Sequence, residues 1–526
     1  MNKEDLEKNI TAFNKVTKGI DFINDKASLS KFSKDIYYES QKPITIACPK
    51  NSEEIKRVLF GIKESTLTLS VRGGGLSYSA GYLTNRNDTV LIDMSCCNRI
   101  IEINQEDMFV HVEAGVTWNQ LNEALEPLGL RTPFWGTGSG LYATVGGGLS
   151  QNAINYGSGR YGTAAESVIG LKVFLGDGLE LRTGSWATEE NPKPFNRYYG
   201  PDLTGLFLGD NGALGIKAEA SLQLIQRPKA TKFVAFSFPS RENFVSAISN
   251  VGRQGIVSEC FGLDPFFLSE RIASTGFADD VHKLLGVAKN QTSILKGVKE
   301  AFKVAAAGRR YLKDVGYTLH MSIDGRDDED VNSSLKIVNN ICMKDSGKEI
   351  DGNIPKLMRG TPFPPPLMML GPKGDRWVPM HGIVPHSLHG KLLDEIDEFM
   401  NSQEYAIDKY NLVWGQVSNL IGSSRVLIEV NLYWKDTLSD MIESYLNVSF
   451  LKSKERYDKN PEAYKAVGEL RKGLSNLFRK NGGTHLQIGR SYPYLDSRMQ
   501  TVSDLLKSLK KEVDPRNQIN PGVLSL

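Results

Sequence analysis

The sequence predicts an α+β protein with two domains, and three observations support this fold class. A chain of 526 residues is longer than a single simple core accommodates. Short β-rich runs alternate with amphipathic helical stretches along most of its length. Glycine-rich loops join these runs as far as about Pro228 and cease after it, while strands and helices continue. A second α+β domain is therefore expected to begin there.

The first region, residues 1–40, is rich in lysine and acidic residues and has helical periodicity, which predicts a helical lead-in. Residues 41–228 follow as the first α+β domain. Within it, Ser52–Phe60 has the pattern of an amphipathic helix, whereas Val90–Met94 and Val110–Val116 are hydrophobic runs typical of strands. The glycine runs between such strands are expected to form loops.

Residues 229–481 make up the second α+β domain. Its expected strands and helices are Phe233–Phe238, Leu388–Met400, Val426–Tyr433 and Pro461–Arg479. The proline-rich run Gly360–Pro366 cannot continue a helix or a central strand, because proline lacks the backbone N–H and restricts φ. It predicts a rigid loop.

Composition narrows the function classes. Hydrophobic residues make up 40% and charged residues 24%, which is typical of a soluble globular protein. A formal net charge of +2 argues against a broad nucleic-acid-binding surface. The sequence shows neither a signal-peptide pattern nor an apolar run long enough to cross a bilayer. We therefore expect a cytoplasmic enzyme without a nucleic-acid or membrane partner, and a homo-oligomer is left open.

Cysteine and histidine residues do not suggest a metal centre. The five cysteines are Cys48, Cys96, Cys97, Cys260 and Cys342. Their spacing fits neither a zinc site nor a disulfide framework, so buried, reduced thiols are expected. Three histidines gather at His381, His386 and His389, on what resembles a strand leading into a turn. No acidic or cysteine ligand accompanies them in the sequence, and no metal is predicted.

The segment Val71–Gly81 carries the first sign of ligand binding. A strand ends there, and Gly73–Gly75 then removes three successive side chains. Consecutive glycines can form a concave group of N–H donors that suits a phosphate or pyrophosphate. Arg72, Ser77 and Ser79 are expected to add charge and hydrogen bonds to the same anion. The alternative is a tight turn between two buried strands.

A second glycine run supports the ligand-binding interpretation. Thr144–Ser150 contains three more consecutive glycines, and the glycine-containing stretch Asn155–Gly162 follows closely. Two loops with bare backbone on one domain fit a long ligand with two ends.

These motifs resemble the FAD-linked oxidase family that includes vanillyl-alcohol oxidase, 4-cresol dehydrogenase and D-lactate dehydrogenase. The matching segments, in the order of that family, are Arg72–Gly75, Val90–Met94, Val110–Val116 with Trp118 opening a helix, Thr144–Gly148, Gly200–Phe207, Gly212–Ile216 and Asp514–Gly522. The collinear order covers nearly the whole chain and is more specific than any single motif.

The resemblance implies a two-domain flavoprotein, with an FAD-binding α+β domain, an α+β cap (substrate) domain, and a final segment, residues 482–526, that returns to the FAD domain. A small-molecule substrate would reduce the flavin, and an electron acceptor or oxygen would reoxidise it. The cofactor-binding residues expected from the matching motifs are Arg72, Gly73, Gly74, Gly75, Leu76, Ser77, Tyr78, Thr144, Gly146, Gly147, Gly148, Ser150, Asn155, Gly157, Gly215, Ile216 and Asn520.

Noncovalent FAD is predicted because this chain lacks a suitable side chain at three positions where relatives link the flavin covalently. Many relatives carry a flavin-linked histidine where this chain has Leu76, and leucine has no nucleophile. Others use a cysteine near the second loop, but Gly136–Leu141 contains none. Vanillyl-alcohol oxidase-like members use a cap histidine before a strand, where Ser423–Arg425 stand here. An unexpected link through His381 or Tyr433 is left open.

The expected catalytic residues are Arg490, His381 and Tyr492. Arg490 matches an arginine that faces the flavin in phenol-oxidising relatives, where it could stabilise reduced flavin or an anionic substrate oxygen. Gly489 stands where those relatives have tyrosine, so Tyr492 or Tyr494 could replace it at a shifted register. His381 could act as a base. The alternatives are an arginine in an ion pair and a packed cap-strand histidine.

The predicted function is an FAD-dependent oxidoreductase that moves a hydride from a small alcohol or phenol-like substrate to flavin N5. Thr163 stands where vanillyl-alcohol oxidase has an acidic residue, which, with Gly489, weakens the case for a para-substituted phenol. The alternatives are a D-2-hydroxy acid dehydrogenase and a noncatalytic flavin-binding protein.

Overall fold

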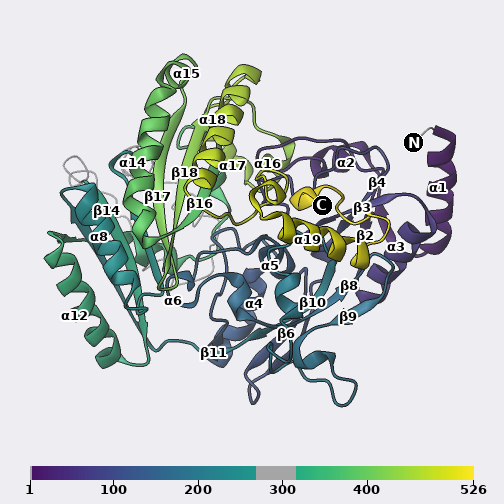
Figure 1. Ribbon diagram of the computed structural model, residues 1–526, viewed down its shortest axis with the longest axis horizontal. Helices are drawn as coiled ribbons and strands as arrows, with labels where there is room; N and C mark the ends of the chain where they lie inside the picture. The colour runs from purple at the N-terminus through teal and green to yellow at the C-terminus, as the bar shows by residue number, and fades with distance from the viewer. Residues whose placement is uncertain (1–2, 268–315) are drawn as a thin grey trace. The chain divides into compact units, whose positions relative to one another are not determined.

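The structure is a computed structural model that describes residues 3–267 and 316–526, and the chain divides into two units (Figure 1). Unit 1 consists of Met1–Ile154, Thr163–Arg227 and Leu486–Leu526, and unit 2 consists of Asn155–Gly162 and Pro228–His485. The chain thus passes into unit 2 at Pro228 and returns to unit 1 at Leu486. The short stretch Asn155–Gly162 differs from the sequence-based division, which placed it in the first domain.

Unit 1 begins with a four-stranded sheet of order β1-β2-β4-β3. Its elements are α1 (Lys3–Val16), β1 (Asp21–Ile23), α2 (Lys26–Phe32), β2 (Thr45–Cys48), α3 (Ser52–Glu64), β3 (Thr68–Arg72), β4 (Thr89–Asp93) and η1 (Met94–Cys96). Strands β2 and β3 both run parallel to β4. The side chain of Asn51 caps α3 by accepting from the Glu54 N–H, and Ile55, Val58 and Ile62 are buried in the core. Parallel pairing places the carboxyl ends of β2, β3 and β4 at one edge of this sheet.

A second, antiparallel sheet of unit 1 has the order β5-β6-β10-β8-β9. Its strands and neighbouring elements are β5 (Ile100–Asn104), β6 (Phe109–Glu113), α4 (Trp118–Leu125), η2 (Glu126–Leu128), β7 (Leu130–Arg131), α5 (Val145–Gln151), η3 (Ala164–Ser167), β8 (Val168–Phe174), β9 (Glu180–Arg182), η4 (Gly184–Ala187), α7 (Leu203–Leu206), β10 (Ile216–Gln223) and β11 (Ile225–Gln226). Trp118 opens α4 as expected. Thr117 and Gln120 form a capping box there, and the Trp118 side chain is fully buried.

The second glycine run is helical, which corrects the expectation of a loop. Gly146–Gly148 lies inside α5, whose first residue follows the N-cap Thr144. A Cβ on Gly146 would lie 2.6 Å from the Ala114 Cβ, and one on Gly148 would lie 2.9 Å from the Trp118 Nε1. Close packing therefore requires glycine here, and it overrides the low helix propensity on which the loop prediction rested.

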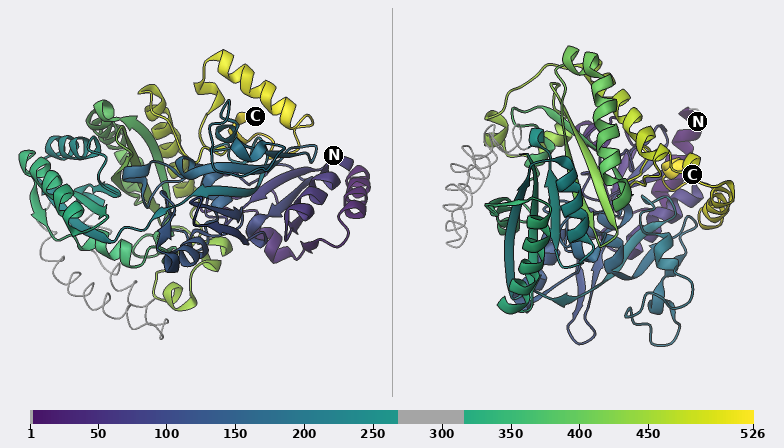
Figure 2. Two further views of the ribbon diagram at one scale, coloured as in Figure 1. Left: turned by 90° about the horizontal axis from the view of Figure 1, so that it is seen from below. Right: turned by 60° about the vertical axis from the view of Figure 1, so that its left-hand side comes forward.

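Unit 2 is built on a seven-stranded antiparallel sheet of order β15-β12-β14-β13-β17-β18-β16. Its elements are α6 (Ser158–Tyr161), β12 (Ala230–Phe238), α8 (Arg241–Gly252), β13 (Glu259–Leu263), α9 (Pro265–Phe267), β14 (Tyr317–Gly325), α12 (Asp328–Lys344), β15 (Lys348–Ile350), α13 (Asn353–Gly360), η7 (Leu367–Met369), β16 (Arg376–Pro385), α14 (His386–Ser402), α15 (Glu404–Lys409), β17 (Val413–Ile421), β18 (Arg425–Trp434), α16 (Asp440–Ser444), α17 (Val448–Lys452) and α18 (Pro461–Lys480). Helices α12, α8, α14 and α18 contact one another in that order and pack on the sheet (Figures 1 and 2).

The predicted elements of this unit are present. Both expected strands lie within β12 and β18, and both expected helices lie within α14 and α18. The proline-rich run continues from the last residue of α13 as irregular backbone over residues 361–366. The fold class, α+β with two domains, is therefore as the sequence predicted.

The C-terminal segment of unit 1 contains η8 (Leu495–Ser497), α19 (Gln500–Val513) and η9 (Val523–Ser525). After α19 the chain runs beside β3, where Ile519 forms a parallel bridge with Leu69. In the described part of the chain, no helix combines the length and the apolar character needed to cross a membrane.

Candidate functional site

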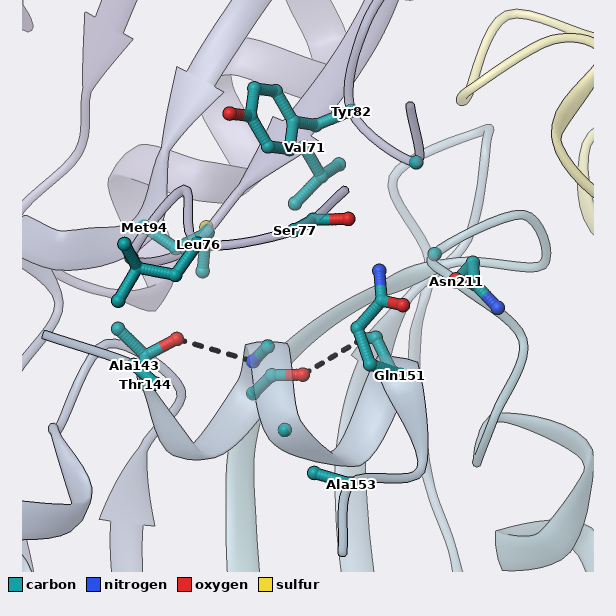
Figure 3. A pocket seen from close by; sticks show the side chains of 18 of the residues that line it. Val71, Leu76, Ser77, Tyr82, Met94, Ala143, Thr144, Gln151, Ala153 and Asn211 are labelled. Carbon is teal, nitrogen blue, oxygen red and sulfur yellow. Dashed lines mark hydrogen bonds between the residues drawn. The ribbon is translucent and has the colours of Figure 1, made fainter. Parts of the chain in front are cut away.

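A pocket in unit 1 is lined by both glycine segments (Figure 3). Gly73–Ser77, the loop after β3, forms one wall, and Thr144, Gly146–Gly148 and Ser150 of the α5 region form another. Val71, Tyr82 and Met94 add side chains from the first sheet and its connections. Segments about 70 residues apart in the sequence thus meet at one site.

The first glycine segment packs directly on the approach to α5. A Cβ on Gly74 would overlap the carbonyl oxygen of Tyr142, and a Cβ on Gly73 would overlap the Thr144 Oγ1. The Tyr142 atom is backbone and has little freedom to move away, and the Thr144 hydroxyl is held by the hydrogen bond that it accepts from the Gly147 N–H. Glycine at these two positions is what allows the two walls of the pocket to come together.

Free backbone donors lie on one wall of the pocket. Within residues 3–267 and 316–526, the N–H groups of Gly75, Leu76 and Ser77 donate to no protein acceptor, and all three residues line the pocket. Three successive N–H groups of this kind can bind an anion, because a backbone donor otherwise pairs with protein or water.

The corresponding donors of α5 are already used. The N–H of Gly146 donates to the Ala114 carbonyl at 2.8 Å. The N–H of Gly147 donates to the Thr144 Oγ1 at 3.2 Å, and that of Gly148 to the Thr144 carbonyl at 2.9 Å. The second segment therefore contributes a wall without side chains, whereas the first contributes hydrogen-bond donors.

Arg72 is placed differently from the anion ligand that the sequence suggested. Its guanidinium lies 3.8 Å from the Asp93 carboxylate and 4.2 Å from the centre of the Phe32 ring. It also donates to the Gly73 carbonyl at 3.3 Å, and a Cβ on Gly75, whose φ is +74°, would overlap it. Arg72 therefore supports the glycine loop from behind, outside the set of residues that line the pocket.

The residues after the glycines divide into two groups. Leu76 and Ser77 line the pocket, and the Ser77 and Ser79 hydroxyls are 3.1 Å apart. Ser79 and Tyr78 are buried outside the pocket lining. Of the two hydroxyls expected at the anion, only that of Ser77 belongs to a lining residue.

Sequence reasoning missed a third wall, formed by Gln151, Asn211, Gly212, Lys217 and Gln487. The Lys217 Nζ is 2.6 Å from the buried carboxylate of Asp210, so the protein already neutralises this cation. Both residues of the Asn211-Gly212 pair have positive φ. The Asp-Asn-Gly turn was a usable signal for this wall, because these residue types favour such conformations.

Of the expected cofactor residues, Gly215, Ile216 and Asn520 differ in where they lie relative to the pocket. Gly215 lines the pocket, whereas Ile216 is fully buried in the core. Asn520 accepts from the Val71 N–H at 3.1 Å and donates to the Gly212 carbonyl at 3.0 Å. It thereby ties the end of β3 to the third wall and is a positioning residue.

Asn155 and Gly157 belong to unit 2 and are bound within it. The Gly157 N–H donates to the Glu259 carboxylate at 2.7 Å, and the Asn155 N–H donates to the Ser158 hydroxyl at 2.9 Å. Arg359 holds the other oxygen of Glu259 at 2.8 Å. These contacts fix the segment on unit 2 and leave it outside the pocket described above.

Arg490 binds backbone within unit 1. Its Nε donates to the Leu83 carbonyl at 3.0 Å and its NH1 group to the Pro521 carbonyl at 2.8 Å. Burial lowers the pKa of the guanidinium. Neither Arg490 nor the buried Tyr492 is among the residues that line the pocket. Through these two hydrogen bonds, Arg490 links the loop that contains Leu83 to the C-terminal segment.

His381 lies on β16 of unit 2 and is 2% exposed. Burial, followed by the nearby His485, lowers the pKa of His381 to about 3. The His485 Nδ1 lies 2.7 Å from the His381 carbonyl oxygen. At neutral pH His381 is an uncharged side chain with very weak basicity, which favours the packed-histidine interpretation.

A family model described as "FAD binding domain" matches residues 43–184. Among curated proteins, the mitochondrial D-lactate dehydrogenase [cytochrome] 1 of Saccharomyces cerevisiae is 29% identical over 218 residues, which are 41% of this chain and 35% of that protein. D-lactate dehydrogenase [cytochrome] of Arabidopsis thaliana is 33% identical over 198 residues, 38% of this chain and 33% of that protein. Glycolate oxidase subunit GlcD of Bacillus subtilis is 29% identical over 214 residues, 41% of this chain and 43% of that protein.

Two solved structures share the fold over nearly the whole chain. p-Cresol methylhydroxylase with substrate bound has a TM-score of 0.74 at 17% identity and covers 100% of this chain and 98% of its own. 4-Ethylphenol oxidase from Gulosibacter chungangensis has a TM-score of 0.72 at 14% identity, with the same two coverages. These likenesses confirm the two-domain flavoprotein fold.

The chain spans only 33–43% of the length of these three curated relatives. The matched segment includes the free donors at Gly75–Ser77 and the side-chain-free wall at Gly146–Gly148. An anion-binding loop beside a bare helix face fits the pyrophosphate of a dinucleotide. The FAD-binding segment and the cofactor FAD, both expected from the sequence, are confirmed.

Proposed function

We propose that this chain, with an FAD-binding domain in unit 1, is an FAD-dependent oxidoreductase that oxidises the CH–OH group of a small molecule. One observation carries the proposal: the segment matched as an FAD binding domain contains three backbone donors, on a pocket wall, that have no acceptor among the residues the structure describes. The named relatives, each matched over about two fifths of this chain, are D-lactate dehydrogenases and a glycolate oxidase subunit.

Different residues of the pocket would hold different parts of the site around FAD. The N–H groups of Gly75, Leu76 and Ser77 would hold the pyrophosphate, and Gly146–Gly148 would let it approach the backbone closely. When bound, FAD accepts a hydride at N5. Arg72 and Asn520 would keep the loop in its shape, since each binds protein groups beside it.

We propose that the cofactor is held without a covalent bond. Leu76 lies on the pocket wall at the position where a linking histidine is expected in relatives, and its side chain has no nucleophile. Acid precipitation of the purified protein should leave the yellow colour in the supernatant. Colour in the pellet would show a covalent link and contradict this point.

A D-2-hydroxy acid is the substrate class we favour, because the curated relatives that match are named for D-lactate and glycolate. A phenol or aryl alcohol is the second candidate, supported by the phenol-oxidising enzymes that share the fold. The contacts of Arg490 with two carbonyl groups argue against its use as a phenolate-binding residue.

An anaerobic donor screen separates these candidates. D-lactate or glycolate should bleach the flavin absorbance of the purified holoprotein, while L-lactate serves as the stereochemical control. Bleaching by 4-cresol or vanillyl alcohol alone would replace the first candidate by the second. A coloured protein that no donor of either class reduces would favour the noncatalytic flavin-binding protein. Readmitting air to the reduced protein then tests oxygen against other electron acceptors.

A further inference from the structure

Two cysteines lie side by side at one edge of the first sheet of unit 1. Cys48 is the last residue of β2, and Cys96 is the last residue of η1, which directly follows β4. Strands β2 and β4 are parallel, with Ala47 opposite Ile92, so both cysteines come at the same end of adjacent strands. Cys48 is buried and Cys96 is exposed. The sequence had suggested a buried thiol at both positions.

The local environment makes Cys96 the reactive member of this pair. The pKa of Cys96 is lowered to about 7, chiefly because the Cys48 thiol hydrogen-bonds to it, with smaller contributions from Ser95 and Lys50. Burial and Asp93 act in the opposite direction. The same interaction, together with burial, raises the pKa of Cys48, which is the donor.

The adjacent Cys97 provides a contrast. Burial raises the pKa of Cys97, and its thiol donates to the Pro49 carbonyl at 3.0 Å. A thiol that is protonated, buried and hydrogen-bonded to backbone is a poor nucleophile. Of the two neighbouring cysteines, only Cys96 combines exposure with a thiol partner.

We propose that Cys96 and Cys48 form a redox-reactive pair, in which a hydroperoxide oxidises Cys96 and Cys48 then closes an intramolecular disulfide. In the first step the Cys96 sulfur attacks one peroxide oxygen, the O–O bond breaks, and a sulfenic acid forms as water or an alcohol leaves. In the second step the Cys48 sulfur attacks that of Cys96, the S–O bond breaks, and water leaves. Two thiols are oxidised by two electrons, and one peroxide is reduced.

The first test uses the wild-type holoprotein and reads thiols directly. After treatment with hydrogen peroxide, the remaining thiols are blocked with iodoacetamide, and tryptic peptides are analysed by mass spectrometry. We expect a cross-linked species that joins the Cys48 peptide to Asn87–Arg99, with fragmentation assigning the bond to Cys96. Dithiothreitol should restore both alkylated peptides. Alkylation of Cys48 and Cys96 after peroxide at the extent seen without peroxide would overturn the proposal, as would a bond to Cys97.

Variants sharpen this test. In Cys48→Ala the sulfenic acid has no partner, so a dimedone adduct should accumulate on Cys96, whereas Cys97→Ala should still form the disulfide. The pH midpoint of Cys96 alkylation should lie near 7 in the wild type. It should rise toward about 8.5 in Cys48→Ala, which is roughly a 15-fold loss of thiolate at pH 7. An unchanged midpoint would show that the two thiols do not interact. These readouts do not depend on the substrate of the flavin site.

Discussion

The two glycine segments of unit 1, Gly73–Gly75 and Gly146–Gly148, both remove three successive side chains beside the same pocket, but they differ in what the backbone still offers. At the end of the first segment, the N–H groups of Gly75, Leu76 and Ser77 are free of protein acceptors in the described chain. In the second, all three glycine N–H groups are bound within the protein. A glycine run can therefore provide free N–H donors, or it can allow another group to approach the backbone closely. The presence of the run in a sequence does not say which of the two it does.

The largest expected effect comes from Gly74→Ala, which tests the close packing of the first segment against the backbone that leads into α5. The new Cβ would overlap the Tyr142 carbonyl oxygen and lie 3.1 Å from the Ala143 Cα. Because both neighbours are backbone, we expect the walls to separate, with a loss of about 3 kcal/mol or more in the free energy of unfolding. FAD should be lost during purification. Urea unfolding and the ratio of flavin to protein absorbance measure the two effects, and a stable, yellow variant would contradict the packing described.

Gly147→Ala is the matched change in the second segment. Its Cβ would meet only the Thr144 Oγ1, at 3.1 Å, and the residue lines the pocket. Without FAD the helix should be unchanged or gain up to about 1 kcal/mol, because alanine has the higher helix propensity. FAD affinity should fall by roughly 10- to 100-fold, as a methyl group enters the pocket, which corresponds to about 1.4–3 kcal/mol. Titration of the apoprotein with FAD measures this affinity. An unchanged affinity would show that Gly147 of α5 does not lie against FAD.

Arg72→Met tests whether the arginine supports the loop or binds the anion. The thioether side chain keeps an apolar contact with Phe32 but leaves the buried carboxylate of Asp93 without its cation. We expect a loss of about 2 kcal/mol in stability, because the buried carboxylate keeps its hydrogen bond from the Ser95 N–H but loses the neighbouring positive charge. FAD affinity measured at two salt concentrations should keep its salt dependence. A clear reduction of that dependence would restore Arg72 as a phosphate ligand.

Thr144→Ala gives the smallest expected effect. The variant loses the N-cap hydrogen bond that the Gly147 N–H donates to the Thr144 Oγ1, which should cost about 1 kcal/mol of stability. Thr144→Ser keeps the hydroxyl and is the control, so it should stay within a few tenths of a kcal/mol of the wild type. Thermal unfolding monitored by circular dichroism measures both. Equal stability of the two variants would show that the cap does not stabilise α5.

Much of the fold followed from local patterns. The strands at β4, β6, β12 and β18 and the helices α3, α14 and α18 were predictable because their periodicity and breakers lie within each element. The helix at Gly146–Gly148 was not, since its glycines are explained by contacts with Ala114 and Trp118 from an earlier part of the chain. Local propensity carries no information about such contacts.

The candidate site was predictable only in part. Gly73–Gly75, Gly146–Gly148 and Gly215 were found from motifs, as were Leu76, Ser77 and Thr144, and the structure places them on one pocket. Gln151 and Gln487 were missed, although their backbones are linked by a hydrogen bond of 3.0 Å. A glutamine more than 300 residues away gives no sequence signal for such a contact.

The sequence by itself determined the order of the motifs, the two α+β regions and the presence of an FAD-binding segment, because each depends on residues close together in the chain. Only the tertiary structure decided that Arg72 lies behind the loop, that Arg490 binds two carbonyl groups, and that Cys96 is exposed beside Cys48. The physical reason is the same in each case. Which donors stay free, which charges are neutralised and which thiols meet depends on partners brought together by folding.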